Sequence, residues 1–213
     1  MFNSRINQMV LGAGAMQSAG LKNITAKHIA LASQSIALIQ ALLPYMRINM
    51  AELSPPGKAT LVMKDFDRLS EDLGAHQQEL RDKLLAIMAD RASKICQRIE
   101  SIDWDATDGG DKSPAVGNDP SRPMADLVKD TITLHKVLSR FYPPEKVQDV
   151  LTEVVKNHSE RIAQSYGRLA LRSSLGKRRL LFDARFFITR LAALDSVRAL
   201  GNQLEVAANN IRV

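Results

Sequence analysis

The chain has 213 residues, of which 45% are hydrophobic, so it contains enough apolar material for one or two packed units. The formal charge of +6 is unevenly spread: residues 1–57 carry a balance of +3, residues 58–121 of −4 and residues 122–213 of +7. This pattern argues against a uniformly basic nucleic-acid binder and points to the last third as the part that meets anions. The single cysteine, Cys96, excludes a disulfide within the chain and fits a reducing compartment.

The composition favours an all-α protein without a membrane span. Strand-forming residues never alternate with polar ones over a usable length, while Ala, Leu, Lys, Arg, Gln and Glu fill most segments. No stretch approaches the roughly 20 uncharged apolar residues of a membrane span, and no leader pattern follows Met1. We therefore expect a soluble all-α fold.

Two helices are predicted before residue 54. The first covers residues 2–18, and Gly20 breaks it. The second begins near Asn23 or Thr25, either of which can cap it, and Pro44 should bend it near its end. Its expected inward stripe consists of Ile29, Ala32, Ile36, Ile39, Leu42, Leu43 and Met46.

One very long helix is predicted from Lys58 to Ile102. This stretch contains no proline and one glycine, Gly74, and apolar residues return every three or four positions. At 1.5 Å per residue it would extend more than roughly 60 Å. The spacing is too irregular to require a strict coiled coil.

A polar loop over residues 103–122 separates two helical portions, 1–102 and 123–213. Three more helices follow it, over about 123–141, 144–169 and 178–209. The last is expected to bury Leu181, Phe186, Ile188, Leu191, Leu194, Val197, Leu200 and Leu204. The prediction is an elongated stack of about six helices.

No residue pattern indicates catalysis, a cofactor or a metal. The run from Gly12 to Ala15 lacks the third glycine and the strand of a dinucleotide fingerprint. The four histidines lie on different predicted helices without a second ligand one turn away, and Cys96 reads as a small buried hydrophobe. We therefore expect a chain that is not an enzyme.

A basic cluster near the end is the best candidate for a functional surface. Eight basic residues between 161 and 190 face one acid, Asp183. The cluster could bind acidic lipid headgroups or an acidic partner, or it could be a solvated helix corner. The residues proposed to form a docking surface are Arg168, Arg172, Lys177, Arg178, Arg179 and Arg185.

Two long stretches carry a resemblance to a known family. They are residues 10–36 (VLGAGAMQSAGLKNITAKHIALASQSI), continuing into 41–45 (ALLPY), and residues 127–139 (LVKDTITLHKVLS), followed by 143–147 (PPEKV). Both resemble the carboxy-terminal region of the vacuolar protein sorting-associated protein 54 family. Residues 186–194 (FFITRLAAL) resemble that family's last helix.

The resemblance implies a subunit of the Golgi-associated retrograde protein (GARP) complex, which tethers endosome-derived vesicles at the trans-Golgi network. It implies a CATCHR-type, exocyst-like helical architecture and a carboxy-terminal module that associates with endosomal membrane. The implied partners are sister subunits, held through the family's amino-terminal region, with SNAREs and small GTPases as further candidates, and nucleic acid is not expected. The implied location is the cytosolic face of the trans-Golgi network and endosomes. The alternative is a helical protein adaptor or an anionic-membrane-binding module unrelated to tethering.

Overall fold

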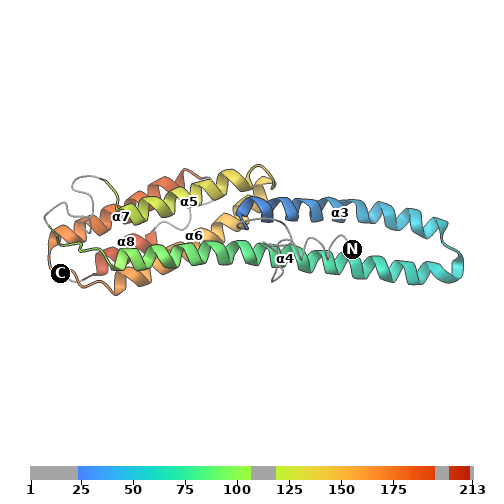
Figure 1. Ribbon diagram of the computed structural model, residues 1–213, viewed down its shortest axis with the longest axis horizontal. Helices are drawn as coiled ribbons and strands as arrows, with labels where there is room; N and C mark the ends of the chain where they lie inside the picture. The colour runs from blue at the N-terminus through green and yellow to red at the C-terminus, as the bar shows by residue number, and fades with distance from the viewer. Residues whose placement is uncertain (1–23, 107–118, 195–201, 212–213) are drawn as a thin grey trace. The chain divides into compact units, whose positions relative to one another are not determined.

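The computed structural model describes residues 24–106, 119–194 and 202–211, and in these ranges the chain is all-α without strands (Figure 1). The fold class predicted from the composition is therefore confirmed. The described helices are α3 (Ala26–Leu53), α4 (Pro56–Glu100), α5 (Arg122–Leu138), α6 (Pro144–Gly167), α7 (Ser174–Ala192) and α8 (Asn202–Asn210). The helix predicted over residues 2–18 lies outside the described residues.

The contacts divide the chain into two compact units. Unit 1 comprises residues 1–84 and 140–142, and unit 2 comprises residues 85–139 and 143–213. The boundary falls within α4, so that helix contributes to both units. The sequence-based division at a 103–122 loop stays a prediction, since most of that segment lies outside the described residues.

Unit 1 is built on α3 and the first part of α4, which run antiparallel (Figure 1). Ser33 Oγ donates to Gln77 Oε1 at 2.6 Å, and Gln77 Nε2 donates to the Ser33 carbonyl at 2.6 Å. Arg47 pairs with Asp67 at 3.0 Å nearer the connection between the helices. These contacts hold one face of α3 against α4.

The buried face of α3 is narrower than the sequence predicts. Ile29, Ala32, Ile36 and Leu43 are buried as expected, but Leu42 and Met46 are exposed. The expectation for these two was wrong because α3 is apolar nearly all round, and its periodicity does not single out one face. Pro44 lies inside the helix, and the helix ends at Leu53, before residue 54 as predicted.

The predicted long helix is confirmed as α4, with 45 residues. At 1.5 Å per residue it extends about 67 Å. It begins at the Ser54 to Pro56 break, where proline fits the first helical turn, and it runs through Gly74 without interruption.

Unit 2 packs α5, α6, α7 and α8 with the second part of α4. The helices contact one another in the pairs α5–α6, α5–α7, α6–α8 and α7–α8. Their shared core is apolar and draws on every one of these helices. Its largest fully buried members are Tyr166, Phe187, Ile99, Met124 and Leu127.

The prediction for the last helix was wrong in two respects. It ends at Ala192, and a separate helix, α8, begins at Asn202. The inward stripe of α7 consists of Leu180, Ala184, Phe187 and Leu191, whereas Leu181, Phe186, Ile188 and Leu194 are only partly buried. Leu204 is buried as predicted, and Val197 and Leu200 lie outside the described residues.

The two ends of the segment predicted as a polar loop, directly after α4 and directly before α5, contain buried residues. Trp104 is buried in the core of unit 2, and its Nε1 donates to the Ile99 carbonyl at 3.1 Å. Ser121 is buried and caps α5 through its side chain. Both ends of the predicted loop are therefore parts of the packed structure.

The expectation that no segment is apolar enough for a membrane span needs correction for α3. By length and composition alone, α3 is long and apolar enough to cross a membrane. A single such helix is weak support for a membrane span, because a core helix passes the same test. Moreover, the Arg47–Asp67 ion pair joins α3 to a helix that carries many charged residues.

Candidate functional site

The predicted basic surface lies in unit 2, at the corner between α6 and α7, and Asp105 organises that corner. Asp105 Oδ2 accepts from the Arg172 backbone N–H at 2.8 Å, and Oδ1 accepts from the Ser173 backbone N–H at 3.0 Å and its hydroxyl at 2.5 Å. The hydrogen bond from the Ser173 hydroxyl is the main reason why the pKa of Asp105 is lowered. Ser173 Oγ in turn accepts from the Gly176 N–H at 3.1 Å, which caps α7.

Arg179 reaches from α7 to the turn that follows α4. Its Nη1 donates to the Trp104 carbonyl at 3.0 Å and to the Ala106 carbonyl at 2.6 Å. These bonds satisfy carbonyl groups beyond the end of α4, so the guanidinium is part of the internal hydrogen bonding of unit 2.

Three more of the predicted surface residues have internal partners. Lys177 Nζ donates to the Ile211 carbonyl at 2.8 Å, next to the end of α8. Arg168 pairs with Glu100 at 3.2 Å, and Arg185 pairs with Glu205 at 3.2 Å. The arginines of these two pairs are more than half exposed, so the pairs contribute little stability and leave part of each cation accessible.

Arg172 and Arg178 are the two predicted residues that remain, and the charge of Arg172 contributes to the lowered pKa of Asp105. Both residues are exposed, and within the described residues neither side chain makes a hydrogen bond or an ion pair. Arg178 and Arg185 are seven positions apart on α7 and so share one helix face. Of the six predicted residues, Arg172 and Arg178 are therefore exposed without a side-chain partner in the described residues. Arg168 and Arg185 are exposed but also form ion pairs.

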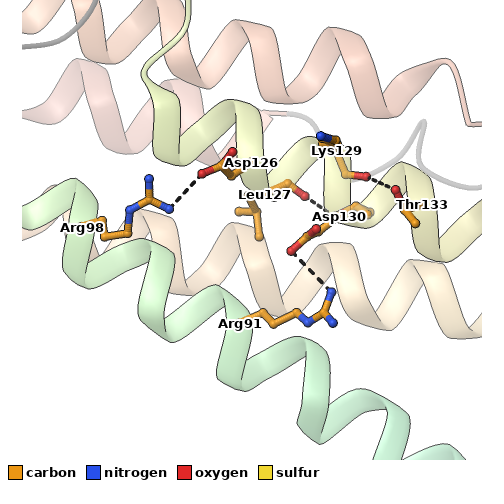
Figure 2. A network of polar contacts seen from close by, with 8 residues as sticks. Arg91, Arg98, Asp126, Leu127, Lys129, Asp130 and Thr133 are labelled. Atoms are coloured by element: carbon orange, nitrogen blue, oxygen red, sulfur yellow. Dashed lines mark hydrogen bonds and ion pairs between the residues drawn. The ribbon is translucent and has the colours of Figure 1, made fainter. Parts of the chain in front are cut away.

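Basic residues outside this corner also bind internally. Arg98 Nη1 donates to Asp126 Oδ2 at 2.9 Å, and Arg91 lies 3.5 Å from Asp130 Oδ2, so two ion pairs join α4 to α5 (Figure 2). Arg161 donates to Ser93 Oγ at 2.7 Å and to Asn157 Oδ1 at 2.9 Å. The charge balance of the last third therefore overstates its free positive charge.

Sequence reasoning missed that the one acid within the basic cluster is buried. Asp183, the single acid of the cluster, is buried, and Ser121 donates to it through both its backbone N–H (2.7 Å) and its hydroxyl. Burial raises the pKa of Asp183 to about 6, despite these hydrogen bonds. Asp183 therefore anchors the start of α5 to α7 and does not neutralise the surface arginines.

A cavity of about 180 Å³ lies in unit 2 between α4 and α6. Its polar lining consists of Glu153, Asn157 and His158, and the rest is apolar. Within the described residues, His158 has no hydrogen-bond partner at either ring nitrogen, and burial lowers its pKa to about 4. A neutral, enclosed imidazole without an adjacent nucleophile does not assemble a recognisable catalytic group.

No cluster of three or more potential metal ligands was found among the described residues. Cys96 is buried and its pKa is raised by burial, so it packs as a small hydrophobe, as predicted. These observations supply no candidate for a bound metal or a reactive thiol in the described ranges.

Comparison with known proteins finds relatives of one family over most of the chain. A family model described as "Vps54-like protein" matches residues 1–91. The chain is 29% identical over 205 residues to vacuolar protein sorting-associated protein 54, chloroplastic, of Arabidopsis thaliana, which covers 96% of this chain. It is 32% identical over 160 residues to the Schizosaccharomyces pombe protein of that name (75% of this chain) and 29% identical over 201 residues to the human one (93%).

The chain spans less than a fifth of the length of these relatives. It covers 19% of the Arabidopsis and human proteins and 15% of the Schizosaccharomyces pombe protein. No solved structure matches the chain.

Proposed function

This chain belongs to the Vps54 family and corresponds to that protein's carboxy-terminal region, and from this premise we propose that it serves a vesicle tether. The proposed process is retrograde transport from endosomes to the trans-Golgi network, as part of the GARP complex. The single observation that carries the proposal is similarity to Vps54 proteins of plants, fungi and animals over most of the chain.

The helical architecture is consistent with a scaffold rather than an enzyme. A helix of 45 residues contributes to both packed units. The described cavity offers no nucleophile paired with a base. We propose that the chain acts without catalysis, in a CATCHR-type arrangement.

For the membrane-associating role, the best-supported surface is the α6–α7 corner. Arg172 and Arg178 are exposed there, and Arg168 and Arg185 add partly accessible charge. Basic residues close to an anionic membrane contribute about 1 kcal/mol each. We propose that this corner contacts anionic lipid on the cytosolic face of the trans-Golgi network and endosomes, while sister subunits, SNAREs or small GTPases meet other surfaces.

Vesicle flotation tests the membrane proposal directly. The variant Arg172→Gln/Arg178→Gln should bind phosphatidylserine-containing vesicles at low salt with about 30-fold weaker partition, because two contributions of about 1 kcal/mol are removed. The matched control, Lys129→Gln/Lys136→Gln, removes the same charge from exposed positions of α5 and should bind much more like the parent chain.

Vesicle flotation and co-purification test the membrane role and the membership of a tethering complex separately. If the wild-type chain fails to bind vesicles, or if both variants weaken binding equally, then the corner is not a lipid site. In that case the protein-adaptor alternative remains, and co-purification of sister tether subunits with the full-length gene product tests it. Absence of those subunits would overturn the tethering proposal itself.

A further inference from the structure

The outward face of α7 carries an aromatic residue between two arginines. The members of this stripe are spaced by four, three and four positions: Arg178, Phe182, Arg185 and Thr189. At about 100° per residue they fall within an arc of about 60° on one side of the helix. The buried residues of α7 occupy an arc whose centre is about 180° away. The stripe therefore points directly away from the core of unit 2.

Contacts on either side of the stripe show where α7 meets its neighbours. On one side, Arg179 donates to two backbone carbonyls of the turn after α4. On the other side, Arg185 Nε lies 3.2 Å from Glu205 Oε1 of α8. These two directions are about 120° apart around the helix, and Arg178 and Phe182 lie between them. The described contacts of α7 thus leave this part of its surface to solvent or to a partner.

Phe182 differs from the other two phenylalanines of α7. Phe187 belongs to the core of unit 2, and Phe186 packs against that core. Phe182 is partly exposed, and among the described residues it neither belongs to the core nor packs against it. An apolar ring at this position is available to an apolar environment outside the chain.

The charge of the stripe is positive and complements an anionic surface. Arg178 is exposed, and within the described residues its side chain has no partner. Arg185 is more than half exposed, although it pairs with Glu205. Arg190 adds a further exposed cation on the next turn. The one acid of α7, Asp183, is buried on the inward side, so it does not offset these charges at the surface.

We infer that Phe182 enters the interfacial region of an anionic bilayer while Arg178 and Arg185 bind lipid phosphates on either side of it. The inference rests on the proposed membrane role of the α6–α7 corner and extends that site along α7. Along the helix axis, Arg178 lies about 6 Å and Arg185 about 4.5 Å from Phe182. Long arginine side chains keep their guanidinium groups among the phosphates while a neighbouring ring lies deeper. A bilayer interface provides the phosphate layer and the apolar layer side by side, which favours lipid as the partner.

Fluorescence quenching tests whether this position enters the bilayer. The chain has one tryptophan, Trp104, which is buried in the core of unit 2. Phe182→Trp adds an indole on the outward face, and vesicles of phosphatidylserine with brominated acyl chains should quench its emission. The parent chain, whose emission comes from Trp104 alone, should show little quenching by the same vesicles. Equally small quenching in the two chains would overturn the inference.

Vesicle flotation measures the contribution of the ring to binding. Phe182→Ala should weaken partition into phosphatidylserine-containing vesicles about 10-fold, because the apolar area of the ring is no longer removed from water. The ratio between parent and variant should persist when salt is raised, since salt screens the arginines but not the apolar contact. The matched control is Tyr45→Ala, which removes an exposed aromatic side chain from α3 and should partition like the parent chain.

The outcomes separate this inference from the proposed membrane role. If Arg172→Gln/Arg178→Gln weakens binding and Phe182→Ala does not, the corner remains a lipid site and the inference is wrong. Equal weakening by Tyr45→Ala and Phe182→Ala would contradict it as well, because the apolar contact would not be specific to α7. If the parent chain does not bind vesicles, the membrane role and this inference both fail. Circular dichroism should show the helicity of the parent chain in each variant, and the quenching experiment keeps an aromatic side chain at position 182.

Discussion

The Oδ1 atom of Asp105 lies 2.5 Å from the position that a β-carbon on Gly176 would occupy. The same oxygen accepts hydrogen bonds from Ser173, so it cannot move away without losing them. Gly176→Ala should therefore destabilise the protein by about 1–3 kcal/mol, even though alanine favours a helix. Urea denaturation followed by circular dichroism measures this change.

Gly74 supplies the control for that substitution. A β-carbon there meets nothing within 4 Å, and Gly74 lies inside α4. Gly74→Ala should raise the free energy of unfolding by about 0.5–1 kcal/mol, because alanine replaces the least favourable helix residue other than proline. If both alanine variants stabilise the protein, the close approach of Asp105 to Gly176 is not a constraint in solution.

Leu191 and Leu194 test the corrected inward face of α7. Leu191 is fully buried in the core of unit 2, whereas Leu194 is only partly buried against it. Leu191→Gln should cost about 3 kcal/mol or more, through lost packing and an amide without partners, and lower the melting temperature by roughly 6 to 12 °C. Leu194→Gln should cost distinctly less in the same thermal melt. An equal loss at the two positions would return Leu194 to the core, as the sequence alone predicts.

This pair also shows how far the sequence specifies the fold. The absence of proline from Lys58 to Ile102 predicts α4 well, because helix continuity is a local property. The face that α7 buries is not local: apolar residues occupy both Leu180 and Leu181 and both Phe186 and Phe187, so packing against α5 and α8 decides which members of these pairs turn inward. The same ambiguity affects α3: apolar residues occur on nearly all sides of this helix, so the sequence does not determine which face is buried.

The candidate site was less predictable, for a related reason. The basic cluster is visible as a run of charges, but the groups that bind Arg179 and Lys177 lie far away in the sequence, at Trp104, Ala106 and Ile211. A count of charges does not distinguish a cation bound to a backbone carbonyl from one that faces solvent. Among the six predicted residues, only Arg172 and Arg178 are exposed without a side-chain partner in the described residues, and the docking role of the cluster stays a prediction.

Tyr166 carries a hydroxyl whose removal should stabilise the protein. The side chain is completely buried, its hydroxyl has no hydrogen-bond partner within the described residues, and burial raises its pKa well above the usual value. Because an unsatisfied buried hydroxyl costs free energy, Tyr166→Phe should raise the free energy of unfolding by about 1 kcal/mol. Tyr45→Phe, at an exposed hydroxyl, should leave it unchanged in the same urea titration. A clear loss of stability in Tyr166→Phe would show that the hydroxyl has a partner.

Two buried groups in unit 2 should affect stability with opposite pH dependence. The pKa of His158 falls from 6.5 to about 4 on folding. Between these two pH values the unfolded chain therefore binds a proton at His158 that the folded chain does not bind. The pKa of Asp183 rises from 3.8 to about 6, so between those values the folded chain binds the extra proton. Acidification from pH 6.5 to pH 4 therefore removes about 3 kcal/mol through His158 and adds about 3 kcal/mol through Asp183.

Single substitutions should separate these two contributions, because in the parent chain they nearly cancel. Relative to the parent, Asp183→Asn should lose about 3 kcal/mol more stability between pH 7 and pH 4, since only the His158 penalty remains. His158→Leu should gain a similar amount relative to the parent over the same interval. Urea titrations of the three proteins at pH 7, 6, 5 and 4 measure these differences, and exposed carboxylates common to all three drop out of the comparison. A difference near zero in either variant would mean that the substituted group titrates near its ordinary pKa and is hydrated in the folded protein.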